Sequence, residues 1–171
     1  MITIRAEKED DLIAIKNIND QAFGQTEEGI IIDKIRASDS SILSLVAEKD
    51  NAVVGHIFYS EATIDFSGET ITGMGLAPMA VLPAYQKEGI GKRLINESLK
   101  ILKKKPIPFI IVLGHEKYYP KFGFEKASKY GIKCQWDGVP DEAFMIMILD
   151  KEKMSKVRGI ASYRAEFNEA M

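Results

Sequence analysis

Apolar residues recur along this chain with two spacings, one typical of helices and one typical of strands. Residues 1–5 predict a first strand. An apolar stripe at helical spacing then runs through residues 12–23, directly behind two acidic residues that suit a helix start. A second stripe through residues 30–35 predicts another helix, which Thr26 is placed to cap.

The middle and the end of the chain are dominated by short, strand-like runs. The runs predicted as strands are residues 43–47, 52–58 with a continuation or repeat at 63–66, 70–82, 109–113 and 144–149. A long amphipathic helix starts at Gly89 and ends before Pro106, and residues 117–121 predict a short helical turn. This order predicts a mixed α/β domain, with helices packed on a largely antiparallel sheet.

Composition places the chain among soluble globular proteins. It has 171 residues, of which 46% are apolar and 28% charged, so one domain with a substantial core is expected. No apolar run approaches the roughly 20 residues of a membrane helix, and residues 1–5 do not resemble a signal peptide. Cys134 is the only cysteine, so no internal disulfide forms; we expect a packing role for it and a cytoplasmic location for the protein.

Charge is unevenly distributed along the chain. The net charge is −2, which argues against a nucleic-acid-binding surface. Residues 86–105 hold seven Lys or Arg side chains and two Glu, an excess of +5 that leaves −7 for the rest. A basic patch on an acidic protein suits a small polyanionic ligand, although residues 103–105 are expected to form a solvated helix face.

The most informative stretch is Gln86–Leu94, at the junction between a strand and the long helix. Two glycines there let several backbone N–H groups point at one place, and the helix dipole adds positive potential. The stretch is not an ATP or GTP phosphate loop, because Lys92 is followed by Arg93. It is not a dinucleotide fingerprint either, because position 94 is Leu. A phosphorylated ligand is predicted to bind here.

Two motifs make this chain resemble a known family. The pattern Gln-x-x-Gly-x-Gly at 86–91, preceded by the run at 76–83, resembles the acetyl-CoA motif of the GNAT superfamily of N-acetyltransferases. The run at 112–124 resembles that family's next strand and helix, ending in a Gly-Phe signature. The resemblance covers residues 1–150, which predicts one GNAT-like domain. It implies a mostly antiparallel twisted sheet of about six to seven strands, with helices on both faces and splayed central strands.

The resemblance also implies a cofactor and a reaction. Acetyl-CoA would be the co-substrate, with no metal, and a primary amine of a small molecule or peptide would attack the thioester directly. Its pantetheine arm would pair with the backbone of Met79 and Val81. The Val81 N–H would stabilise the oxyanion, and Tyr119 would lie near the sulfur; an aromatic packing role for Tyr119 is the alternative. The residues implied in cofactor binding are Met79, Ala80, Val81, Gln86, Lys87, Glu88, Gly89, Ile90, Gly91, Lys92 and Tyr119.

Several points stay open at the level of the sequence. No general base is identified; the possibilities are Glu61, His56, His115 and Glu116, or a water chain. His56 is expected to be an ordinary strand residue that either faces solvent or occupies a satisfied core position, and Tyr118 is expected to be a core residue. The alternative function is a catalytically silent CoA-binding regulatory or sensor domain, and a longer acyl-CoA is a third possibility. Residues 151–171 form an extension that docks on the domain, borders the substrate cleft or forms a homodimer contact.

Overall fold

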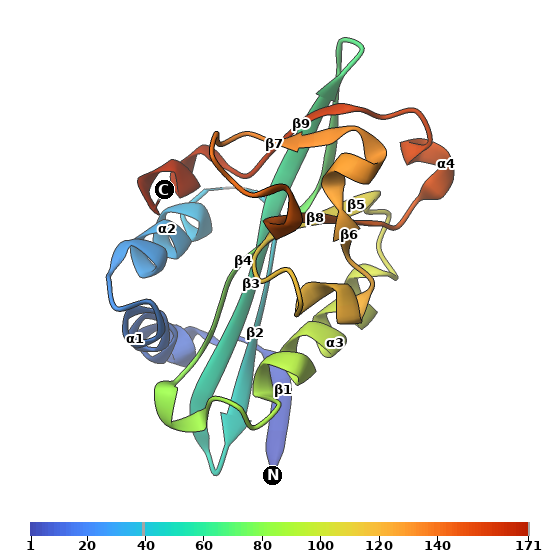
Figure 1. The fold of residues 1–171 in the computed structure, drawn as a ribbon. Coiled ribbons are helices and arrows are strands. Elements are labelled where there is room, and N and C mark those ends of the chain that lie inside the picture. The colour runs from blue at the N-terminus through green and yellow to red at the C-terminus, as the bar shows by residue number, and fades with distance from the viewer. Residues whose placement is uncertain (39, 171) are drawn as a thin grey trace. The chain divides into compact units, whose positions relative to one another are not determined.

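The structure is a computed structural model that describes residues 1–38 and 40–170. The chain divides into two compact units. Unit 1 comprises Met1–Tyr59, Ala77–Ile101 and the residues from Ala165 onward, and unit 2 comprises Ser60–Leu76 and Leu102–Arg164. Two long strands, β3 (Ala52–Phe66) and β4 (Glu69–Val81), pass through both units, and Figure 1 follows the elements along the chain.

Unit 1 combines one end of the sheet with three helices. Its strands pair in the order β1-β2-β3-β4, and β1 runs antiparallel to β2 from the pair Ile2↔Lys49 to the pair Ala6↔Leu45. The elements introduced here are β1 (Ile2–Ala6), the 3-10 turn η1 (Glu9–Asp11), α1 (Leu12–Phe23), α2 (Glu27–Arg36), β2 (Ile42–Lys49), the 3-10 turn η2 (Pro83–Tyr85), α3 (Ile90–Leu102) and the 3-10 turn η6 (Ala165–Ala170).

The helices of unit 1 bury most of the apolar stripes that the sequence predicts, although Phe23 and Ile30 remain exposed. Helices α1 and α2 lie side by side (Figure 1), and their fully buried side chains include Ile15, Ile18, Ile31, Ile32 and Ile35. A Cβ added to Gly55 of β3 would lie 3.0 Å from Ile90 of α3, so the absent side chain lets this helix approach the sheet closely. The prediction for Thr26 is half right. It occupies the N-cap position of α2, but its side chain accepts no capping hydrogen bond.

Unit 2 holds the other end of the sheet, where the strands pair in the order β7-β9-β3-β4-β5-β8-β6. Strand β5 is parallel to β4, pairing Met74–Leu76 with Ile110–Val112, and antiparallel to β8. The new elements are β5 (Phe109–Leu113), η3 (Tyr119–Phe122), β6 (Glu125–Lys126), η4 (Ala127–Tyr130), β7 (Ile132–Cys134), η5 (Asp141–Ala143), β8 (Phe144–Ile148), α4 (Lys151–Met154) and β9 (Gly159–Ser162).

The mixed, mostly antiparallel sheet predicted from the sequence is confirmed. Within the described residues the sheet has nine strands, where about six to seven were predicted. The additional strands, β6, β7 and β9, have only two to four residues each. Such segments are too short to carry a period-2 pattern, and they become strands only because a partner strand lies beside them. Among residues 1–38 and 40–170, none of the helices is both long and apolar enough to span a membrane.

Candidate functional site

The loop between β4 and α3 presents a group of backbone N–H donors, as the sequence predicts. Lys87 and Gly89 adopt left-handed conformations, with φ of +66° and +84°. The first α-helical hydrogen bond runs from the Arg93 N–H to the Gly89 carbonyl at 3.1 Å. The N–H groups of residues 90–92 therefore precede any acceptor within the helix and lie at its positive end. This arrangement is suited to a phosphate group.

A lysine from a distant turn joins this loop. Lys49, at the end of β2, places its Nζ 2.7 Å from Oε1 of Glu88 and 5.4 Å from the centre of the Tyr85 ring. The hydrogen bond to Glu88 raises the pKa of Lys49 above its ordinary value. Lys49 thus balances the negative charge of Glu88. This is the acidic residue of the loop at residues 86–89, which directly precedes α3. Sequence reasoning missed this contact because 39 residues separate the partners.

The end of β4 has backbone groups that point away from β3. The Leu82 N–H donates to the Val54 carbonyl of β3 at 2.9 Å. Since the N–H and C=O groups alternate in direction along a strand, those of Val81 and Met79 face the opposite way. In agreement, the Val81 carbonyl accepts a hydrogen bond from the Gln86 side chain at 2.9 Å. Ala80, which precedes Val81, is buried.

Tyr119 lies in unit 2, at the start of η3, and is 9% exposed. Its ring packs edge-to-face against Tyr118 and Phe124, with centroid distances of 5.2 and 5.9 Å. A Cβ on Gly114 would lie 2.4 Å from this ring, so only glycine fits beneath it. Burial, together with the neighbouring Tyr118, raises the pKa of Tyr119 to about 12. Its hydroxyl is therefore a neutral donor at physiological pH. Tyr118, predicted as a core residue, is only half-buried.

His56 of β3 is fully buried and hydrogen-bonded on both ring nitrogens, one of the two environments that the sequence allowed. Its Nδ1 is 3.2 Å from Asn19 Nδ2, and its Nε2 is 2.8 Å from Ser44 Oγ. Asn19 Nδ2 also donates to the Ile15 carbonyl at 3.0 Å, which identifies it as the donor to His56. His56 Nε2 therefore carries the proton and donates a hydrogen bond to Ser44 Oγ. Burial, and to a lesser degree Arg36, lowers the pKa of His56 to about 3.

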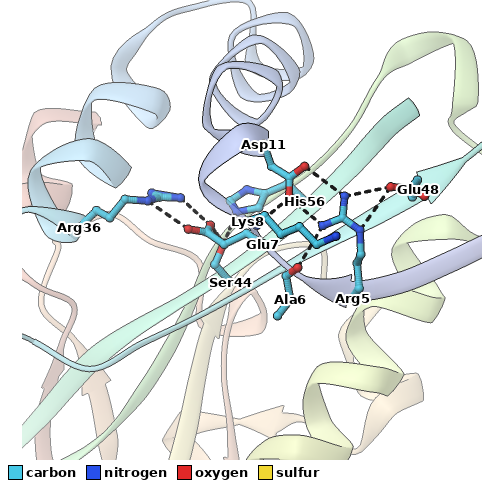
Figure 2. A network of polar contacts seen from close by, with 9 residues as sticks. All are labelled: Arg5, Ala6, Glu7, Lys8, Asp11, Arg36, Ser44, Glu48 and His56. Atoms are coloured by element: carbon cyan, nitrogen blue, oxygen red, sulfur yellow. Dashed lines mark hydrogen bonds and ion pairs between the residues drawn. The ribbon is translucent and has the colours of Figure 1, made fainter. Parts of the chain in front are cut away.

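The hydrogen-bond chain continues from Ser44 through Glu7 to Arg36 (Figure 2). Ser44 Oγ donates to the Glu7 carboxylate, and Glu7 accepts two hydrogen bonds from Arg36, at 2.5 and 3.2 Å. These hydrogen bonds thus link α1, β3, β2 and α2. Because both ring nitrogens of His56 are hydrogen-bonded and its side chain is out of reach of solvent, the geometry assigns this network to structure. It removes His56 from the possible general bases.

An ionic cluster lies next to this hydrogen-bond network in Figure 2 and joins β1 to η1 and β2. The Arg5 guanidinium lies 2.7 Å from the Asp11 carboxylate and 2.9 Å from Glu48. The Lys8 N–H also donates to Asp11 at 2.7 Å. The Arg5 hydrogen bond holds the pKa of Asp11 below its ordinary value. The cluster anchors the turn between β1 and α1 to the sheet.

The other possible bases lie in different surroundings. Glu61 is half-buried, whereas His115 and Glu116 are exposed. His115 Nδ1 accepts a hydrogen bond from the Lys117 N–H at 3.2 Å. Within residues 1–38 and 40–170, no three His, Cys, Asp or Glu side chains are grouped in a way that could hold a metal ion. Cys134 is half-buried, and burial raises the pKa of its thiol, so the reactive thiolate is disfavoured.

Comparison with known proteins gives consistent matches. A family model described as an acetyltransferase (GNAT) domain matches residues 3–127. The uncharacterized N-acetyltransferase YhbS of Escherichia coli K12 is 30% identical over 166 residues, covering 96% of this chain and 98% of YhbS. YjhQ of the same strain, also named an uncharacterized N-acetyltransferase, is 36% identical over 118 residues, covering 67% of this chain and 64% of YjhQ.

Solved structures extend the likeness to three dimensions. The crystal structure of E. coli YhbS in complex with CoA has a TM-score of 0.88 and 29% identity, covering 98% of this chain and 92% of that one. A GNAT family acetyltransferase from Brucella melitensis in complex with acetyl-CoA has a TM-score of 0.78 and 33% identity, covering 98% of both chains. The fold, the loop before α3 and these matches agree: the chain belongs to the GNAT family of acetyltransferases.

Proposed function

We propose that this GNAT acetyltransferase transfers an acetyl group from acetyl-CoA to a primary amine by direct attack on the thioester. The observation that carries the proposal is the continuous segment from Met79 to Lys92. This segment is 14 residues long. Its first part is the end of β4, where the backbone groups of Met79 and Val81 point away from β3. Its second part is a loop with left-handed residues, followed by the first N–H groups of α3, which have no acceptor within the helix. The first part suits an amide-containing arm, and the second suits a pyrophosphate.

The cofactor would lie along this segment in one direction. The pyrophosphate would bind to the N–H groups of residues 87–92, with Lys87 and Lys92 as nearby cations. The pantetheine arm would then run back along β4, exchanging hydrogen bonds with Met79 and Val81. Gln86 would brace the loop through its bond to the Val81 carbonyl. The complexes of YhbS with CoA and of the Brucella protein with acetyl-CoA support acetyl-CoA as the co-substrate.

The reaction would begin when the amine nitrogen attacks the thioester carbonyl carbon. A C–N bond forms, the carbonyl oxygen becomes an oxyanion that accepts from the Val81 N–H, and the amine loses a proton. The C–S bond then breaks and CoA leaves as a thiolate. An oxyanion-hole donor of this kind typically contributes about 3 kcal/mol.

Tyr119 would donate a hydrogen bond to the departing sulfur and keep its own proton. Its pKa of about 12 is well above the value of about 8.5 of an ordinary thiol. Complete transfer of the proton to a thiolate would therefore cost about 5 kcal/mol. The thiolate would be protonated from solvent, or by the proton that the amine releases. The acceptor amine is expected to be cationic in solution, since the chain outside residues 86–105 carries a net charge of −7.

Calorimetric titration with acetyl-CoA tests the cofactor site. Gly89→Val should weaken binding at least about tenfold, because a β-branched residue disfavours φ near +84° and would reshape the loop. Gly138→Val is the matched control, since Gly138 has φ of +82° and equally open surroundings. Equal effects of the two variants would contradict the assignment. Binding without amine-dependent thiol release would instead indicate a silent CoA sensor.

A further inference from the structure

Unit 2 has a depression at the segment that joins β5 to η3, with a volume of about 340 Å³. Four residues line it: His115, Lys117, Tyr118 and Lys121. All four belong to unit 2, so the place is formed within one compact part of the chain. We call it the η3 depression.

The backbone of this segment brings three of the four side chains into one row. The Tyr118 N–H donates to the His115 carbonyl at 3.1 Å, and the Lys121 N–H donates to the Tyr118 carbonyl at 3.3 Å. Both bonds join residues three apart, as in a 3-10 helix, in which side chains three positions apart lie above one another. His115, Tyr118 and Lys121 therefore form one row, and Lys117 lies beside it.

The aromatic ring of Tyr118 is held in place by its neighbours. It packs edge-to-face against Tyr119, at a centroid distance of 5.2 Å, and against Phe122, at 5.3 Å. Burial raises the pKa of Tyr118 above its ordinary value, so the hydroxyl keeps its proton at neutral pH. Within the part of the chain that the structure describes, this hydroxyl bonds to no other residue, so it is free to donate to a ligand.

A backbone hydrogen bond decides which nitrogen of His115 carries the proton. His115 Nδ1 accepts from the Lys117 N–H at 3.2 Å, so in the neutral ring the proton is on Nε2. The imidazole is exposed, and its Nε2 can donate to a ligand. Because the accepting nitrogen is occupied, this side chain adds a donor to the depression.

Lys117 and Lys121 supply two positive charges. Both side chains are exposed, and among residues 1–38 and 40–170 neither takes part in an ion pair. Lys117 also lines a second depression, together with Glu116 and Glu142, but in the described chain neither carboxylate pairs with it. Both ammonium groups therefore remain free to bind an anion.

Charge and donor number together select the class of ligand. A phosphate monoester has a charge of about −1.5 to −2 at pH 7 and three strong acceptor oxygens. Two ammonium groups, a phenol and an imidazole N–H match this charge and these oxygens, and hydrogen bonds between charged partners are the strong ones. A carboxylate, with one negative charge, would leave one lysine uncompensated.

We propose that the η3 depression is a binding site for a phosphate monoester. The site goes beyond the acetyl transfer proposed above and uses none of the residues of the loop before α3. Two sources offer this chemistry, the 3′-phosphate of CoA and a second, separate phosphorylated molecule. Binding measurements distinguish them.

NMR titration with inorganic phosphate observes the site directly. The protein has two histidines and His56 is buried, so the ring resonances of His115 report on the depression. Phosphate should shift these resonances saturably, and acetate should bind about twofold to fivefold more weakly. Sodium chloride at equal ionic strength is the reference. A phosphate shift no larger than that in chloride, or equal affinity for acetate, would overturn the proposal.

Two double variants separate a local site from the overall charge of the protein. Lys117→Met with Lys121→Met should weaken phosphate binding about fourfold to twentyfold, because each exposed ion pair contributes about twofold to fivefold. Lys103→Met with Lys105→Met removes the same charge from exposed lysines of the same unit and should change the affinity less than about twofold. Tyr118→Phe keeps the ring and should weaken binding at least about twofold. Equal losses in the two double variants would contradict a local site.

Calorimetry with two cofactors identifies the source of the phosphate. If it is the cofactor, Lys117→Met with Lys121→Met weakens binding of acetyl-CoA but not of acetyl-3′-dephospho-CoA. If it is a second molecule, both cofactors bind normally to this variant, and phosphate still shifts His115 in wild-type protein saturated with acetyl-CoA. A common loss of affinity for both cofactors would contradict the proposal, since the lysines would then not recognise a monoester. A wild-type protein that binds phosphate but not acetyl-CoA would refute the proposed function and leave this inference intact.

Discussion

Burial of His56 should make the protein sensitive to mild acid. The imidazole is 0% exposed, and its pKa is lowered from 6.5 to about 3 in the folded protein, first by desolvation and then by Arg36. In the unfolded chain it recovers its ordinary pKa. Between these two values the unfolded state binds the additional proton, so the free energy of unfolding increases with pH. The contribution is fully present above about pH 6.5 and is lost as the pH falls toward 3.

The size of the effect follows from the two pKa values. One pKa unit corresponds to 1.36 kcal/mol, so the complete loss is about 5 kcal/mol. Between pH 8 and pH 4.5 the expected loss is about 3 kcal/mol. This is a large fraction of the 5–15 kcal/mol that is usual for the stability of a domain.

Urea unfolding at a series of pH values measures this loss. His56→Gln replaces the ring by a group that does not titrate, so the loss of stability between pH 8 and pH 4.5 should be smaller by about 3 kcal/mol than in the wild-type protein. His115 is exposed and is the only other histidine, so His115→Gln provides the control and should retain the wild-type slope. Parallel pH curves for the wild-type protein and His56→Gln would refute the assignment of a buried, neutral imidazole.

Three further predictions concern the cofactor loop, the buried network and the reaction. Lys49→Met should weaken acetyl-CoA binding about threefold to tenfold by leaving Glu88 unbalanced, and adding Glu88→Gln should restore it; calorimetry of the two variants and their combination measures the coupling. Arg36→Met should lower the free energy of unfolding by about 3 kcal/mol, because the part-buried Glu7 carboxylate loses its ion-pair partner, and urea denaturation checks this. Tyr119→Phe should reduce kcat about 10- to 100-fold with little change in KM; in the wild type, kcat should show no Tyr119 titration below pH 10, since its pKa is about 12.

The sequence by itself determined the features that depend on neighbouring residues. Glycines at 89 and 91 behind a strand, followed by apolar residues at helical spacing, specify a loop with free N–H groups and the helix after it, because both properties are local. The long strands β3 and β4 were predictable for the same reason. Each carries enough β-forming residues to be recognised without its partner.

Tertiary structure decided everything that depends on contacts between distant residues. Lys49 meets Glu88, His56 meets Asn19 and Ser44, and Tyr163 meets Leu76 and Leu113 only after the sheet has formed. The short strands β6, β7 and β9 likewise exist because partner strands lie beside them. Spacing along the chain contains no signal for such pairs. Their chemistry arises from burial and alignment, which are properties of the folded protein and not of any segment alone.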